Sequence, residues 1–202
     1  MLLFTHLLLA VCWIAFCGLH SLLAAHDVKQ KIIPLLKRGD AHYRVLYILF
    51  AFAGFVVIVL YQLSVRSIRL FRPNLIILIT GIVIGLLGVT IMAICITRYF
   101  MLLSGLKGLF KNDTTPVLLQ NGLHRRVRHP LYMGTFMFIW SLFLLFPSLS
   151  LGISNVIITV YTIAGARLEE KKLVKEFGAA YIAYREKVPM FIPRLRNTLI
   201  NK

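Results

Sequence analysis

Five apolar stretches separated by polar segments dominate the pattern of hydrophobic and polar positions in this chain. They cover residues of about 2–25, 44–63, 75–96, 131–147 and 149–164. A helix needs roughly 20 apolar residues to cross the hydrocarbon core of a bilayer, and each stretch approaches that length. The pattern therefore predicts an all-α fold, a polytopic membrane helix bundle with about five transmembrane helices.

The last two apolar stretches are short and lie close together in the chain. Only Pro147 and Ser148 separate them. Proline can begin a helix but interrupts one from inside. We therefore expect these two stretches to form a short helical hairpin.

Apolar side chains recur at helical spacing after the hairpin, which predicts an amphipathic, cytosolic C-terminal helix. Gly178 is expected to divide this helix, and Pro189 and Pro193 to end it. Such a helix either lies on the membrane surface or forms a lid over a site that faces the cytosol. The apolar positions are Leu173, Phe177, Tyr181, Tyr184 and Val188.

The third apolar stretch carries three glycines at close spacing, Gly81, Gly85 and Gly88. Small residues at such spacing let membrane helices approach closely. The stripe is expected to pack against another helix of the bundle or to form a dimer face.

Composition and charge place the chain in a membrane. Apolar residues make up 59% of it, above the roughly 45–50% of soluble domains. A net charge of +16 would suggest a nucleic-acid partner if the protein were soluble. Here, however, segments with many Lys and Arg residues alternate along the chain with segments that have fewer. There are five in 26–44, three in 64–74, six in 97–130 and nine from 165 onward. This pattern fits the positive-inside rule. It predicts an outside N-terminus, a cytosolic C-terminus, the bilayer as partner, and no nucleic acid.

The three cysteines, Cys12, Cys17 and Cys95, all fall within apolar stretches and lack the spacing of metal ligands. Free cysteine behaves as a small buried apolar residue. We therefore expect no metal site.

A polar island interrupts the apolar pattern between residues 122 and 134. Proline is favoured at the first helical position, so a helix is expected to begin at Pro130. The amides of its first turn and the positive end of its dipole would then form an anion site, or simply a well-capped helix end. His129 adds a hydrogen-bond donor there, and Tyr132 adds a hydroxyl.

The only adjacent acidic pair, Glu169 and Glu170, follows the last apolar stretch. Helical spacing places Arg167 on the face of Glu170, so surface ion pairing is one interpretation. The other is a carboxylate that receives an ammonium group. An anion site and such a carboxylate together suit the zwitterionic end of an amino acid.

These motifs, taken in order, resemble the integral-membrane methyltransferases, which include the isoprenylcysteine carboxyl methyltransferases and the phospholipid N-methyltransferases. The N-terminal half is similar to the subgroup that holds methanethiol S-methyltransferases and proteins linked to nitrogen-oxide metabolism, through Trp13, His20-Ser-Leu-Leu-Ala24 and Tyr43-Arg-Val-Leu-Tyr47. The C-terminal motifs are Gly122-x-His124-x-x-x-Arg128-His129-Pro130-x-Tyr132-x-Gly134, Glu169-Glu170, Phe177-Gly178-x-x-Tyr181-x-x-Tyr184 and Val188-Pro189-x-x-Ile192-Pro193.

The resemblance implies S-adenosylmethionine as methyl donor and an active site that faces the cytosol. It implies a small or lipophilic acceptor, either a thiol, an amine or a carboxylate, with lipophilic acceptors entering laterally from the bilayer. It divides the chain into a three-helix membrane region, 1–96, and a cofactor-binding region, 97–202. The implied cofactor-binding residues are Pro116, Val117, Leu118, Leu119, His124, His129, Pro130, Leu131, Tyr132 and Glu169.

The sequence also departs from this family at particular positions. His124 replaces a usual aromatic residue, and Gly165 stands where the isoprenylcysteine enzymes carry an arginine, with Arg167 two residues further on. The remaining candidates for a catalytic role are His124 and Arg167, and the sequence assigns no general base. The alternatives are a membrane NADPH-dependent reductase of the sterol-reductase type and a non-catalytic membrane protein on the same scaffold.

Overall fold

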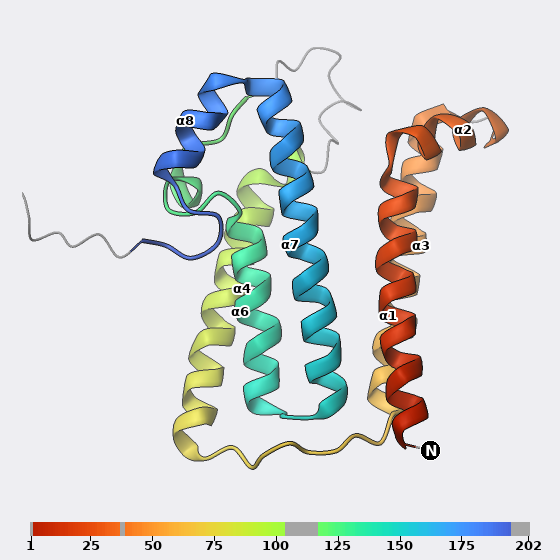
Figure 1. Cartoon of the computed structure of the whole chain (residues 1–202), viewed down its shortest axis with the longest axis vertical. Coiled ribbons are helices and arrows are strands. Elements are labelled where there is room, and N and C mark those ends of the chain that lie inside the picture. Colours follow the sequence, from red (N-terminus) through yellow and green to blue (C-terminus); the bar gives the residue numbers. More distant parts are fainter. Residues whose placement is uncertain (1, 37–38, 104–116, 195–202) are drawn as a thin grey trace, which may run out of the picture. The chain divides into compact units, whose positions relative to one another are not determined.

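The structure is a computed structural model, which describes residues 2–36, 39–103 and 117–194. Within these ranges the chain is helical, and its one β contact is an isolated bridge between Arg69 and Ser148. The all-α prediction is confirmed (Figure 1). The helices are α1 (Leu2–Ala24), α2 (His26–Leu36), α3 (Gly39–Ser64), α4 (Leu75–Leu103), the 3-10 helix η1 (Gly122–Arg125), α6 (Pro130–Leu145), α7 (Leu149–Phe177) and α8 (Ala179–Lys187).

The five predicted apolar stretches all lie in helices. Four of these helices, α1, α3, α4 and α7, are long and apolar enough to cross a membrane. The fifth, α6, has 16 residues and a length of about 24 Å, less than the roughly 30 Å hydrocarbon core. The chain is thus an integral-membrane helix bundle.

The helical hairpin is also confirmed, since α6 ends at Leu145 and α7 begins at Leu149. The segment between α3 and α4 pairs with the hairpin turn. The Leu70 amide donates to the Pro147 carbonyl at 2.8 Å, and the Leu149 amide donates to the Ile68 carbonyl at 2.9 Å. These bonds satisfy backbone groups that would otherwise be costly to bury near lipid.

Two elements differ from the prediction. The helix α7 continues to Phe177, well past the end of the apolar stretch at residue 164. Residues 167–176 are mostly Leu, Glu, Lys and Arg, which are strong helix formers, so the helix extends beyond its apolar part. The segment after α1 contains the helix α2, which hydropathy did not indicate because polar residues interrupt its apolar ones.

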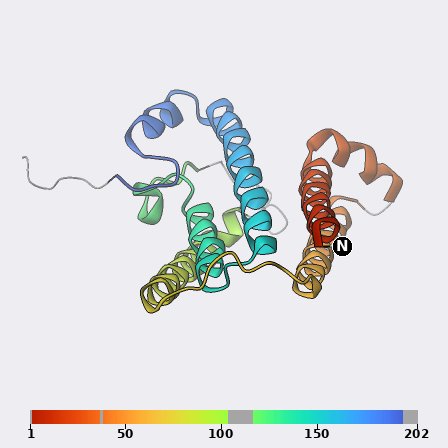
Figure 2. The ribbon, with the colours of Figure 1, turned by 60° about the horizontal axis from the view of Figure 1, so that its bottom comes forward.

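The C-terminal amphipathic segment is divided into two helices at Gly178, as predicted. Gly178 has a φ of 54°, a conformation that glycine adopts without a steric penalty, and the chain turns back there into α8 (Figure 2). The apolar stripe of α8 faces the protein, where two of its side chains and that of the residue after the helix are buried in one cluster. The cluster comprises Tyr181, Tyr184 and Val188, packed against Leu118, Leu173, Val174 and Phe177. The apolar stripe is thus engaged in contacts with the protein, and the lid and the membrane-surface helix both stay predictions.

The chain forms two compact units. Unit 1 comprises residues 1–78 and 142–161, and unit 2 comprises residues 79–141 and 162–202. In unit 1, α1 and α3 lie side by side (Figure 1), and its core includes Leu9, Trp13 and Ile58. The predicted division into a membrane region, 1–96, and a cofactor-binding region, 97–202, concerns function and not compactness, and it stays a prediction.

In unit 2, glycines bring α4 and α6 into close contact. A Cβ atom at Gly88 would lie 2.8 Å from the Gly134 carbonyl oxygen, and one at Gly85 would lie 2.7 Å from the Ser141 hydroxyl oxygen. Neither position has room for a larger side chain without a shift. These two glycines of the predicted stripe therefore pack within the bundle.

Candidate active site

The candidate site is built around the beginning of α6 in unit 2. The helix begins at Pro130, as predicted, and Pro130 and His129 are both buried. Within the first turn of the helix, the ring of Tyr132 stacks on that of His129, with ring centroids 5.5 Å apart and an interplanar angle of 14°. Proline fixes the first helical residue, so the two rings are held at the same end of α6.

The backbone that leads into α6 pairs with the segment that follows α8. The Arg128 amide donates to the Pro189 carbonyl at 2.9 Å, and the His129 amide donates to the Met190 carbonyl at 3.1 Å. These two amides are therefore engaged by the protein itself. Any anion site at the helix end is confined to the amides further into its first turn.

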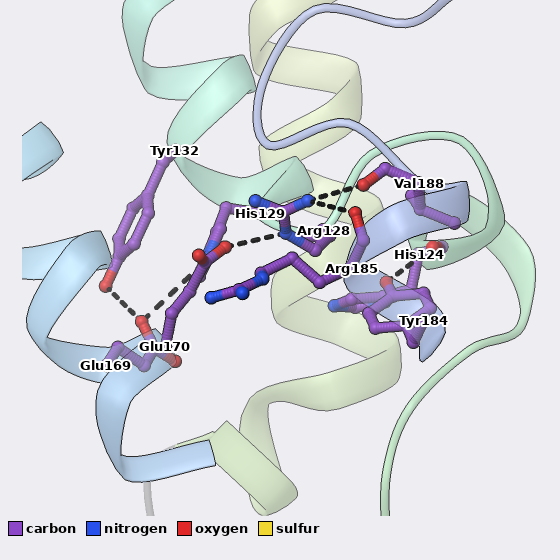
Figure 3. A network of polar contacts seen from close by, with 9 residues as sticks. All are labelled: His124, Arg128, His129, Tyr132, Glu169, Glu170, Tyr184, Arg185 and Val188. Atoms are coloured by element: carbon purple, nitrogen blue, oxygen red, sulfur yellow. Dashed lines mark hydrogen bonds and ion pairs between the residues drawn. The ribbon is translucent and has the colours of Figure 1, made fainter. Parts of the chain in front are cut away.

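The two adjacent glutamates of α7 occupy different environments, because successive helical residues point about 100° apart. Glu170 is buried and accepts a hydrogen bond from Arg128 Nε at 2.6 Å, and its Oε1 lies 3.2 Å from His129 Nε2. The Glu169 side chain is 40% exposed. Its Oε2 accepts from the Tyr132 hydroxyl at 3.1 Å and lies 3.7 Å from His129 Nδ1 (Figure 3).

The Arg128 guanidinium connects Glu170 to the C-terminal segment. Besides its bond to Glu170, its Nη1 donates to the carbonyls of Arg185 at 2.9 Å and Val188 at 2.6 Å (Figure 3). The side chains of both ion-pair partners are 11% exposed. The planar guanidinium group carries several N–H donors and can bind several acceptors at once. Here it binds the Glu170 carboxylate and two backbone carbonyls.

Two tyrosines of α8, Tyr181 and Tyr184, are buried near this ion pair. The Tyr184 hydroxyl donates to the His124 carbonyl at 2.6 Å. Burial raises the pKa of Tyr184 to about 12, with Arg128 opposing the shift and Glu170 adding to it. Burial, reinforced by Glu170, also raises the pKa of Tyr181, which is 1% exposed. Both hydroxyls therefore stay protonated at neutral pH.

His124 lies in η1 and is buried. Burial lowers the pKa of His124, and the nearby His129 lowers it further. The His124 ring is therefore neutral at pH 7, which suits a proton acceptor better than an anion-binding group.

The remaining predicted residues are distributed unevenly. Leu131 follows Pro130 in α6 and is half-buried, Leu118 packs against the tyrosine cluster of α8, and Leu119 beside it is half-buried. Val117 is exposed, and Pro116 lies outside the described residues. Arg167 is exposed on α7.

The proposed surface pairing of Arg167 with Glu170 is not the arrangement observed. Glu170 is buried and pairs with Arg128 and His129 instead. Two opposite charges attract more strongly away from water than at a surface, so the inward pair is the stronger one.

Sequence reasoning did not assign a role to Arg128, Glu170 or Phe191. Arg128 and Glu170 both stood inside motifs, but nothing in one sequence distinguishes which glutamate of a pair faces inward. Phe191 lies against His129 and Phe136, with ring centroids 5.9 and 5.2 Å away. Its position between two prolines and its aromatic character were the available signals.

Chemically, the site combines a half-exposed carboxylate with a hydroxyl, an imidazole and aromatic rings. A carboxylate that is still accessible to solvent can receive an ammonium group. Aromatic faces also attract cations. The arrangement therefore suits a positively charged ligand better than an anion alone.

Comparison with known proteins gives a family for this scaffold. A family model described as NnrU protein matches residues 8–172, which is well over half of the chain. The chain belongs to the NnrU protein family. The match covers both the N-terminal helices and the glutamate pair of this NnrU family member.

Curated relatives of this NnrU family member carry methyltransferase names. A methanethiol S-methyltransferase from Pseudomonas deceptionensis is 40% identical over 76 residues, which is 37% of this chain and 28% of that protein. A protein-S-isoprenylcysteine O-methyltransferase from Saccharomyces cerevisiae is 37% identical over 84 residues, or 41% of this chain and 35% of that protein. The chain thus spans only about a third of the length of these relatives. No solved structure matches it significantly.

Proposed function

We propose that this protein is an integral-membrane methyltransferase that uses S-adenosylmethionine as its methyl donor. The main support is that His129, Tyr132 and Glu169 meet at one end of α6 while the Glu169 carboxylate remains 40% exposed. The methyltransferase names of the relatives agree with this proposal. A reductase gains no support from those names.

The donor set fits the amino-acid end of the cofactor. Glu169 offers a carboxylate to the ammonium group, with Tyr132 and His129 orienting that carboxylate from 3.1 and 3.7 Å. The dipole of α6 favours the cofactor carboxylate near its first turn, at Leu131 and Tyr132. In this proposal the backbone of residues 116–119 contributes further contacts, and Pro130 and His124 line the pocket.

The cofactor, when bound, supplies an activated methyl group on a positively charged sulfur. The protein therefore needs mainly to align the acceptor, and such positioning is worth roughly 7–11 kcal/mol in favourable cases. Tyr132 and Phe191 would exclude water and offer aromatic faces to positive charge. His124, held neutral by burial, is the available proton acceptor for an acceptor that does not arrive ionised.

The acceptor that we favour is a small thiol, which reacts as its thiolate. Gly165 occupies the position of an arginine in the isoprenylcysteine enzymes, so a clamp for an acceptor carboxylate is missing there. The name of the methanethiol S-methyltransferase relatives points the same way. We further propose that the N-terminus is outside and that the site and C-terminus face the cytosol, as the distribution of Lys and Arg indicates.

The direct test is calorimetric titration of the purified protein in lipid nanodiscs with S-adenosylmethionine, followed by transfer of a labelled methyl group to methanethiol. We expect binding by the wild type, and binding weaker by roughly ten- to a hundredfold in Glu169→Gln, because a charge-assisted hydrogen bond is lost. Glu186→Gln, at an exposed glutamate of α8, is the matched control. A folded wild type that binds NADPH but not S-adenosylmethionine would point to the reductase. Binding without transfer to any thiol, amine or carboxylate would point to the non-catalytic alternative.

A further inference from the structure

The segment after α8, residues 188–191, here called the strap, lies across the beginning of α6. Val188 is extended, with φ −113° and ψ 126°. Its neighbours Pro189 and Met190 accept the amides of Arg128 and His129, and Phe191 packs against the His129 ring. The strap therefore covers the same end of α6 at which His129 and Tyr132 stack.

One side chain fastens this strap. Arg128 donates from Nη1 to the carbonyls of Arg185 and Val188, while its Nε is anchored on Glu170 of α7. The guanidinium thus joins three segments: the beginning of α6, the end of α7, and the junction of α8 with the strap. Its side chain is 11% exposed, so water competes weakly for these bonds.

We propose that Arg128, anchored by Glu170, is a positioning residue that latches the strap closed over the cofactor site and so controls how fast a ligand leaves. The identity of the ligand in this inference rests on the proposed function. The latch itself does not depend on it. Arg128 does not touch the ligand; it acts through Phe191 and the backbone of the strap. Because the latch consists of few bonds, the strap can open without unfolding of the helices.

The latch is tested without any ligand by hydrogen–deuterium exchange with mass spectrometry in lipid nanodiscs. The relevant peptides cover residues 126–133, which contain the two amides that pair with the strap, and residues 186–192. We expect Arg128→Met to accelerate exchange in both by roughly ten- to a hundredfold, the equivalent of losing hydrogen bonds to a charged group. Peptides from the middle of α6, residues 134–144, should be unchanged.

Arg128→Lys keeps the charge opposite Glu170 but replaces the fork with a single point of contact. It should fold and give an intermediate acceleration. The matched control is Arg126→Met, which removes an exposed arginine two residues away and should leave both peptides unchanged. Exchange at the wild-type rate in folded Arg128→Lys and Arg128→Met would overturn the latch, as would an acceleration shared equally by residues 134–144. If only Arg128→Lys folds, its rate decides.

The second readout is the dissociation rate of S-adenosylmethionine, measured by stopped-flow competition. Opening of the latch should raise the dissociation rate about tenfold or more while the association rate changes little. Failure of the wild type to bind this cofactor would contradict the proposed function and leave the exchange result as the test of the latch. Normal binding with an unchanged dissociation rate in the variants would overturn the latch alone.

Discussion

In unit 1 the polar contacts that join α1, α3 and α7 at Gln62 are made by neutral groups, whereas in unit 2 the segment just before α6 is joined to α7 by opposite charges. Trp13 donates from its ring nitrogen to the side-chain amide oxygen of Gln62 at 3.3 Å, and the Ser154 hydroxyl donates to the same oxygen at 2.6 Å. In unit 2, Arg128 and Glu170 face each other at 2.6 Å. Both sets join segments that are more than 40 residues apart in the sequence.

The two sets differ in whether a polar group next to them remains accessible to solvent. In unit 1 the side-chain amide oxygen of Gln62 accepts hydrogen bonds from two donors of the protein itself. In unit 2 the Glu169 carboxylate, next to the buried pair, keeps 40% of its side-chain surface exposed. Charge near lipid is costly and is usually retained for function. The neutral contacts hold helices together, and in the proposed function the charged ones also prepare a binding site.

The largest effect is expected when the charged contact is broken. Glu170→Ala leaves the Arg128 guanidinium buried without its carboxylate, which costs about 3–5 kcal/mol when one partner of a buried pair is removed. The measurement is the free energy of unfolding in detergent by denaturant titration. Glu186→Ala removes an exposed glutamate and should change stability little.

A double variant separates the cost of an orphaned charge from the value of the pair. Arg128→Met with Glu170→Leu replaces both charges by apolar side chains, so it should recover much of the stability that Glu170→Ala loses. Equal stability of Glu170→Ala and the wild type would remove the contrast between the two units.

A smaller effect is expected from breaking the neutral contact. Gln62→Leu deprives the Trp13 ring nitrogen of its acceptor, while the Ser154 hydroxyl keeps the Ser150 carbonyl at 3.0 Å. The expected cost is about 1 kcal/mol, since hydrogen bonds between membrane helices average roughly 0.6 kcal/mol. The same unfolding titration measures it. A loss as large as that of Glu170→Ala would contradict the comparison.

A pH-dependent effect is expected from His124. Burial and the neighbouring His129 lower its folded-state pKa below the value in the unfolded chain, so the unfolded state binds the proton first as pH falls. Stability is therefore full above about pH 6.5 and declines below it, down to the folded pKa. His124→Gln should flatten this part of the stability profile, measured by thermal unfolding from pH 7.5 to 5. An unchanged profile would mean that His124 titrates alike in both states.

The smallest effect on stability is expected for Glu169→Gln. The side chain is half-exposed, and the amide can still accept from the Tyr132 hydroxyl, so the free energy of unfolding should change by no more than about 0.5 kcal/mol. Ligand binding should nevertheless weaken. A stability loss comparable to that of Glu170→Ala would mean that both glutamates are structural.

Local rules accounted for much of the fold and for part of the site. Pro130 and Gly178 determine helix boundaries through their own backbone geometry, so a single sequence suffices to place them. The helix α2 and the extension of α7 depend on helix propensity without continuous hydropathy, which is a weaker signal. Which of Glu169 and Glu170 faces inward depends on the rotation of α7 against α6 and α8, and that rotation is a property of packing.

The Arg128 latch holds the strap through main-chain oxygens, those of Arg185 and Val188, and the neighbouring pairing uses those of Pro189 and Met190. Every residue type presents a carbonyl, so most side chains between 185 and 190 can be exchanged while the fastening persists. The number of residues between these carbonyls, in contrast, cannot change. A single inserted or deleted residue would shift each oxygen away from its donor, so this part of the chain tolerates changes of composition far better than changes of length.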